Sequence, residues 1–145
     1  MQRDEILETL QLELQIPDLA FNASHVCRLV FDQRLTVDLE CQPDQTMLHI
    51  YSVVGQDTNL DAAGYRELLS ANLFGHGSGD SVLAIDDQRD EILLFRSWNL
   101  DTLTSAQLTK DLVQFVAAAG TWQDRLQGGG IASDETVPDS AAMRV

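Results

Sequence analysis

The sequence predicts an α+β domain in which three helices pack on one twisted, mainly antiparallel sheet of about five strands. Three observations carry this prediction. Apolar residues recur at helical spacing in three segments, and five other segments alternate between apolar and polar residues or run apolar over the length of a strand. Short polar turns separate neighbouring strand segments. The predicted order of elements is α-β-β-β-α-β-β-α.

The first helix is expected over residues 3–15, because apolar residues recur there every three or four positions and Pro17 then ends it. Its apolar residues are Ile6, Leu7, Leu10 and Leu14. Three strands are expected next, at 25–32, 35–41 and 46–54. The second strand alternates cleanly, with Leu35, Val37, Leu39 and Cys41 facing inward. The third is apolar on both faces, so it lies centrally in the sheet or is covered by another element.

The second helix is expected to begin at an Asp61 cap and to end at the glycine-rich turn 75–79. Strands are expected at 81–86 and 91–98, and a last helix is expected after a Thr104 cap. Three consecutive glycines, Gly128 to Gly130, mark the end of the domain. Residues 1–127 are therefore predicted to form one domain and residues 128–145 a flexible C-terminal tail.

The chain is strongly acidic, with 23 acidic and nine basic residues among 145 and a net charge of −14. Such a surface repels phosphate backbones and anionic membranes, which disfavours nucleic acid and membrane partners. The N-terminus lacks the basic start and apolar run of a secretory signal. Cys27 and Cys41 lie in apolar runs and are expected to be buried thiols in a reducing compartment. We therefore expect a cytoplasmic protein.

No set of residues is obviously suited to catalysis. The best metal candidates are His25, Cys27, Cys41 and His49, but they lack the close C-x-x-C type of spacing that zinc sites use. The glycine-rich run 75–79 leaves a helix and enters a strand, the reverse of a phosphate-binding loop. We therefore predict a protein that is not an enzyme and has no cofactor or metal, with a small metal-binding enzyme domain as the less favoured alternative.

Apolar side chains exceed the needs of a single core. Val26 and Val30 lie on the outer face of the first strand, the third strand is apolar on both faces, and the second helix carries a wide apolar stripe. Exposed apolar surface of this extent usually marks a protein interface. The alternative is that all of it packs beneath the longer helices.

Four segments carry a resemblance to a known family. They are DLAFNASHVCRLVFDQ (18–33), MLHIYSVVG (47–55), LLSANLFG (68–75) and EILLFRSWNLD (91–101). Together with the order of elements and the acidic composition, they resemble the class I chaperones of bacterial type III secretion, of the Tir-chaperone (CesT) family and its multi-effector branch. The likeness covers residues 3–133.

This resemblance implies a cytoplasmic homodimer that holds the N-terminal chaperone-binding segment of an effector extended and hands it to the secretion ATPase. It implies a dimer interface on the second helix and fourth strand, at Tyr65, Leu68, Leu69, Leu73, Val82 and Ala84. It implies effector contacts on the first helix and the outer sheet face, at Leu12, Ile16, Val26, Arg28, Val30, His49 and Tyr51. Arg28 departs from the apolar character of that face. It either forms an ion pair with an acidic residue of the cargo or is simply solvated. The alternative function is a regulatory protein of the same fold that sequesters an anti-activator.

Overall fold

The computed structural model describes residues 1–128, so the predicted tail lies, from residue 129 on, outside the described residues. The elements follow the predicted order. They are α1 (Arg3–Leu14), β1 (Val26–Phe31), β2 (Leu35–Glu40), β3 (Met47–Gln56), α2 (Ala62–Ala71), β4 (Val82–Asp86), β5 (Glu91–Asn99) and α3 (Ser105–Gly128), with short 3-10 turns η1 (Asp57–Asn59) and η2 (Leu73–Gly75). The α+β prediction is confirmed.

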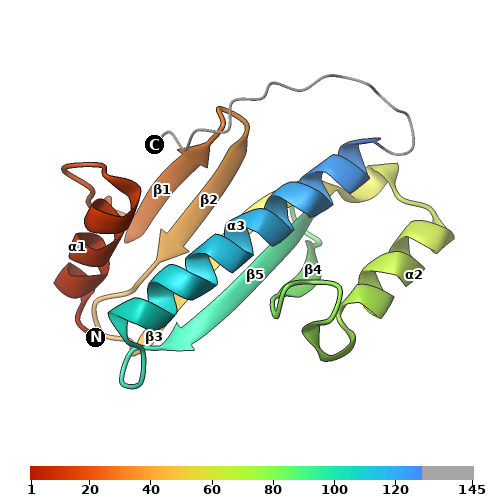
Figure 1. The fold of residues 1–145 in the computed structure, drawn as a ribbon. Coiled ribbons are helices and arrows are strands. Elements are labelled where there is room, and N and C mark those ends of the chain that lie inside the picture. The colour runs from red at the N-terminus through yellow and green to blue at the C-terminus, as the bar shows by residue number, and fades with distance from the viewer. Residues whose placement is uncertain (129–145) are drawn as a thin grey trace.

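One antiparallel sheet with the strand order β1-β2-β3-β5-β4 forms the centre of the molecule. Helix α3 crosses one face of this sheet, α1 packs beside it, and α2 lies next to the β4 edge (Figure 1). Within residues 1–128, no helix lies on the opposite face of the sheet (Figure 1). This part of the chain therefore forms two layers, with its helices on one side of the sheet.

The core lies between the sheet and the helices α1 and α3. Each of the first three strands turns alternate residues into it, such as Leu29, Val37 and Ile50, and all three are 0% exposed. Helix α1 contributes Ile6 and α3 contributes Phe115, each also 0% exposed. No helix among residues 1–128 is both long enough and apolar enough to cross a bilayer.

A buried carboxylate connects α3 to β5. Oδ2 of Asp111 accepts hydrogen bonds of 2.8 Å from Arg96 Nη2 and 2.8 Å from Trp98 Nε1. Oδ1 accepts one of 2.7 Å from Gln107 Nε2. Because Asp111 is 2% exposed, these three donors take the place of water.

The predicted helix caps are confirmed. The Asp61 carboxylate accepts a hydrogen bond of 2.9 Å from the backbone N–H of Gly64, and the Thr104 hydroxyl accepts one of 3.2 Å from that of Gln107. The first strand ends one residue earlier than predicted, at Phe31. Asp32 and Gln33 have φ of 54° and 60°, so both belong to the tight turn and not to the strand.

The glycine-rich turn is a structural corner. Gly75 and Gly79 adopt positive φ of 73° and 62°. A Cβ at Gly79 would lie 2.9 Å from the Cβ of Ala118, and Trp122 Nε1 donates a hydrogen bond of 2.9 Å to the carbonyl of Gly77. The turn therefore packs directly on α3, which accounts for its glycines without a phosphate ligand.

Candidate protein-binding surfaces

The uncovered face of the sheet gathers most of the predicted effector-binding residues. Strand register places Arg28, Asp38, Tyr51, Phe95 and Val82 in one row across all five strands. Neighbouring rows contain Val26 and His49 on one side and Val30 on the other. Five of the seven predicted contacts therefore share one surface: Val26, Arg28, Val30, His49 and Tyr51.

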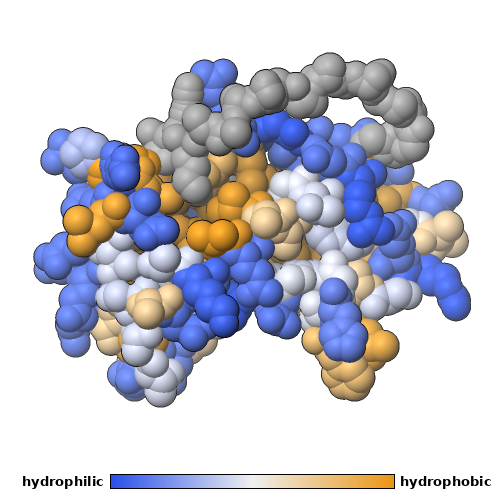
Figure 2. Space-filling model, in the orientation of Figure 1, coloured by the Kyte–Doolittle hydropathy of each residue, from blue (hydrophilic) through white to orange (hydrophobic). Residues whose placement is uncertain are grey.

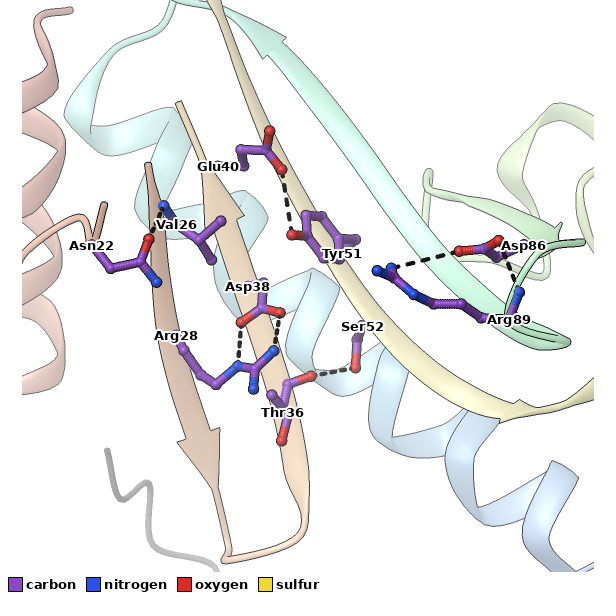
Figure 3. Close-up of polar contacts among 10 residues, drawn as sticks. All are labelled: Asn22, Val26, Arg28, Thr36, Asp38, Glu40, Tyr51, Ser52, Asp86 and Arg89. Atoms are coloured by element: carbon purple, nitrogen blue, oxygen red, sulfur yellow. Dashed lines mark hydrogen bonds and ion pairs between the residues drawn. The ribbon is translucent and has the colours of Figure 1, made fainter. Parts of the chain in front are cut away.

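A groove runs across this face, and we call it the open-face groove (Figure 3). Its apolar lining consists of Val26, Tyr51, Val53 and Leu93. Its polar lining consists of Asn22, Arg28, Asp38, Asp86, Arg89 and Glu91. The groove is therefore mixed, with the Arg28–Asp38 pair in the sheet between its apolar residues, and it can hold an extended peptide that alternates apolar and polar side chains.

Arg28 is fixed within this groove by Asp38. Arg28 donates from Nε and Nη2 to the two carboxylate oxygens of Asp38, at 2.8 and 2.7 Å (Figure 3). The Arg28 side chain remains 65% exposed while that of Asp38 is 9% exposed. The hydrogen bond and charge of Asp38 raise the pKa of Arg28. The arginine that departs from the apolar pattern is thus oriented by a partner in its own sheet, and its remaining N–H donors face solvent.

Tyr51 lies at the centre of the groove. Its hydroxyl donates to Glu40 Oε2 at 3.4 Å (Figure 3). Burial, followed by the charges of Asp38 and Glu40, raises the pKa of Tyr51 to about 12. The phenol stays protonated at neutral pH, and because its single O–H is directed to Glu40, its oxygen can only accept a further hydrogen bond.

The four metal candidates lie on different faces of the sheet. Cys27 and Cys41 are buried at 2% and 0% exposure on the core side, and burial raises the pKa of both thiols. His49 faces the open side, where its Nδ1 lies 2.6 Å from Ser97 Oγ. Within residues 1–128 no group of three or more histidine, cysteine or acidic residues could hold a metal ion.

The outer edge of β1 is a second notable feature of this side. Asn22 pairs with the backbone of Val26, the first residue of the strand. The Asn22 backbone N–H donates to the Val26 carbonyl at 2.9 Å, and the Asn22 Oδ1 accepts from the Val26 N–H at 3.1 Å. Alternation along a strand directs the backbone groups of Arg28 and Val30 to the same side. These groups form no backbone hydrogen bond to another described residue, so the edge can accept an added strand.

Leu12 and Ile16 lie elsewhere, at the C-terminal end of α1. They line a shallow groove with Glu8, Gln11, Gln15 and Pro17. Leu12 is 81% exposed. The structure thus separates the predicted effector contacts into two surfaces, one on α1 and one on the sheet.

The predicted dimer residues lie around the end of α2 and along β4. Leu69, Leu73 and Val82 are 73%, 60% and 43% exposed. Tyr65 is half-buried and bonded to Asp57, and Ala84 is half-buried on the open face of β4. Leu68 differs from the others, because it is 5% exposed and packs in the core of its own chain.

Phe74 joins this set, although sequence reasoning did not select it. It is 81% exposed and has φ of 53°, a left-handed conformation that is unusual for a bulky residue. Figure 2 shows an apolar area at the tip of the molecule where α2 ends. Of the eight large apolar side chains exposed among residues 1–128, five lie between Leu69 and Ile85. We call Leu69, Leu73, Phe74 and Val82 the α2–β4 surface.

Sequence reasoning also missed the β5 side of the open-face groove. Leu93 and Phe95 alternate with the buried Ile92 and Leu94, so the run EILLFRSW is apolar on both faces, as β3 is. That two-sided pattern was the available signal. Arg89 reaches the groove from the β4–β5 turn, and no sequence pattern places it there.

Comparison with known proteins agrees with this architecture. The model of the Tir chaperone protein (CesT) family matches residues 5–123. A Tir chaperone from Citrobacter freundii is 26% identical over 107 residues, which cover 74% of this chain and 68% of that protein. A chain in the crystal structure of the ExsC–ExsE complex superposes with a TM-score of 0.71 at 21% identity, covering 87% of this chain and 97% of that one. One in the ExoT–SpcS complex from Pseudomonas aeruginosa superposes with a TM-score of 0.59 at 26% identity, covering 80% and 92%.

Proposed function

Because this chain belongs to the Tir chaperone protein (CesT) family, which groups class I type III secretion chaperones, we propose that it binds the N-terminal chaperone-binding segment of an effector and keeps it extended for secretion. The observation that carries the proposal is the open-face groove beside the free β1 edge. The core is complete without this face, so its apolar residues are available to a second polypeptide.

An extended segment suits both features of the site. Strand addition at Arg28 and Val30 would satisfy the free backbone groups, while apolar side chains of the segment contact Val26, Tyr51 and Leu93. The shallow groove at Leu12 and Ile16 gives the same segment a second contact on α1. A chain with net charge −14 keeps such a complex soluble.

The remaining expectations form part of this proposal. The chaperone acts in the cytoplasm as a homodimer joined through the α2–β4 surface, serves more than one effector, and delivers its cargo to the secretion ATPase. The homodimer rests on the exposure of Leu69, Leu73 and Phe74. The number of effectors and the delivery step rest on the family likeness.

Affinity purification from the native cell, followed by mass spectrometry, identifies the cargo. The N-terminal segment of each recovered effector is then co-expressed with the chain. We expect a stable complex with the wild type and at least a tenfold weaker one with the Val26→Asp/Val30→Asp variant, a loss of about 1.4 kcal/mol or more. The variant replaces two valines on the open face of β1 by charged residues, one of them, Val26, in the groove lining.

Val113→Asp is the matched control. Val113 is 56% exposed, but it lies on α3, on the opposite side of the sheet. This control is expected to bind as the wild type does. Equal binding by all three proteins would place the cargo elsewhere, and recovery of no effector from the cell would refute the proposed function itself.

A further inference from the structure

We infer that a pocket between the β1–β2 turn and α3 binds a lysine or arginine side chain of a protein partner. The cavity measures about 270 Å³ and lies on the helix-covered side of the sheet, away from the open-face groove. Phe31, Leu35 and Val116 form apolar walls, and Asp32, Gly120 and Gln123 are also part of its lining. Figure 1 shows the turn and α3 on this side of the molecule.

Two buried oxygen atoms at this pocket have no hydrogen-bond donor among residues 1–128. Gln123 is 8% exposed and donates from Nε2 to the carbonyl of Arg34 at 3.2 Å, but its Oε1 has no partner there. Oδ1 of Asp32 is likewise buried without a partner among these residues. A buried acceptor without a donor is destabilising, and native proteins satisfy nearly all of them. The two oxygens are therefore acceptors that the N–H groups of a ligand can satisfy.

Gly120 keeps the pocket open. It lies in the interior of α3, where glycine is unfavourable relative to alanine. A Cβ at this position would meet no atom within 4 Å, in contrast to Gly79, whose Cβ would lie 2.9 Å from Ala118. Packing therefore gives no reason for glycine at position 120, whereas a longer side chain there would project toward the cavity.

The charges of the pocket favour a cation. Arg34 and Asp124, which also line the pocket, form an ion pair with each other. Asp32 forms no ion pair among the described residues, and its carboxylate is left to balance a positive charge. The methylene stem of lysine or arginine suits the apolar walls, while its terminal N–H groups suit the acceptors. A carboxylate or an aliphatic side chain would leave both acceptors unpaired.

Nuclear magnetic resonance tests this inference with two model side chains, the N-acetyl N-methylamides of arginine and lysine. Added to the 15N-labelled chain, they are expected to shift the Gln123 side-chain amide and the backbone amides of residues 31–35 and 117–124, with saturation in the millimolar range. The norleucine compound, which has a stem but no cation, is expected to produce no saturable shift.

Variants at Gly120 separate the pocket from nonspecific binding. Gly120→Met fills the cavity and is expected to weaken binding at least fivefold, whereas Gly120→Ala adds one methyl group and is expected to bind within twofold of wild type. The melting temperature of each variant confirms that it folds. Asp32→Asn, at a turn position that asparagine tolerates, is expected to weaken binding independently.

Three results would overturn the inference. The first is an absence of shifts with both cations, which would mean a cavity that holds only water. The second is equal shifts with the norleucine compound. The third is unchanged binding by a folded Gly120→Met or Asp32→Asn variant. None of them depends on whether the open-face groove binds an effector.

Discussion

Asp111 illustrates how one residue fixes the position of a helix. It is 2% exposed and accepts hydrogen bonds from Arg96, Trp98 and Gln107, so it joins the first half of α3 to the end of β5. Its loss would leave the Arg96 guanidinium, whose side chain is 18% exposed, without its charge partner. A network of this kind is sensitive to the removal of any one member.

We therefore predict that Asp111→Ala lowers the free energy of unfolding by about 3–5 kcal/mol, the usual effect of leaving a buried charge uncompensated. Urea denaturation followed by circular dichroism measures the change. Asp101→Ala, an exposed acidic position, is the control and should change it by less than about 0.5 kcal/mol. A loss below about 1 kcal/mol for Asp111→Ala would show that the network contributes little.

Tyr51 gives a pH-dependent prediction. Burial and the neighbouring carboxylates raise its pKa from 10.0 to about 12. The folded state holds the phenol proton more tightly, so this contribution to stability is complete below pH 10 and is lost as the pH rises from 10 toward 12. Subtracting the ultraviolet phenolate titration of Tyr51→Phe from that of the wild type isolates Tyr51. A midpoint at or below pH 10 would contradict the observed burial and hydrogen bond.

Residue-level prediction from sequence succeeded where a pattern was local. The caps at Asp61 and Thr104 followed from residue type and position. The interface role of Leu68 is implied by the family resemblance and stays a prediction; the apolar stripe that it shares on α2 does not tell which members face the chain's own core, where Leu68 is 5% exposed. The Asp111 network joins residues 15 apart on different elements, so no local pattern reveals it.

At the scale of elements, the two edges of the sheet differ. The Asn72 amide, at the end of α2, donates to the Leu83 carbonyl at 2.9 Å and accepts from the Leu83 N–H at 2.8 Å. The β4 edge is therefore bonded at its second residue, Leu83, by a side chain. Among the described residues, the β1 edge is bonded at its first residue, Val26, by Asn22 and not at Arg28 or Val30. Natural sheets protect their edges in such ways, and an edge left open is available for pairing.

The α2–β4 surface yields a prediction about assembly. With Leu69, Leu73 and Phe74 this exposed, the wild type should elute as a dimer of twice 16.0 kDa. The Leu69→Glu/Leu73→Glu variant should be a folded monomer by light scattering and circular dichroism, and Phe74→Ser should weaken the dimer more mildly. Leu12 on α1 is also strongly exposed, at 81%, so the Leu12→Glu variant is the control and should remain a dimer. A fully dimeric double variant would place the interface elsewhere.

Periodicity predicted the elements and their order, because each strand and helix carries its own hydrophobic pattern. It placed the first turn one residue late, since Asp32 and Gln33 adopt positive φ without the Asn-Gly signature of such turns. Phe74 was also missed. Its exposure depends on the left-handed turn after α2, which composition alone does not indicate.

Residues 1–128 form a two-layer fold in which no described element covers one face of the sheet. Helices α1 and α3 complete the core on one side, whereas the other side combines a groove of mixed polarity, a fixed arginine and a strand edge that no described residue pairs beyond Val26. The acidic residues are spread along the chain, and a net charge of −14 disfavours self-association. We expect a second polypeptide, and not a small molecule, to occupy the open face.

Hydrogen–deuterium exchange on the chain alone and on its complex with the effector segment measures whether a polypeptide occupies the open face. We expect slower exchange in the complex at the backbone amides of Arg28 and Val30, which acquire partners from the added strand. We expect no change at Leu83, whose amide already bonds Asn72. Unchanged exchange along β1, with protection confined to the α3 side of the sheet, would contradict this expectation.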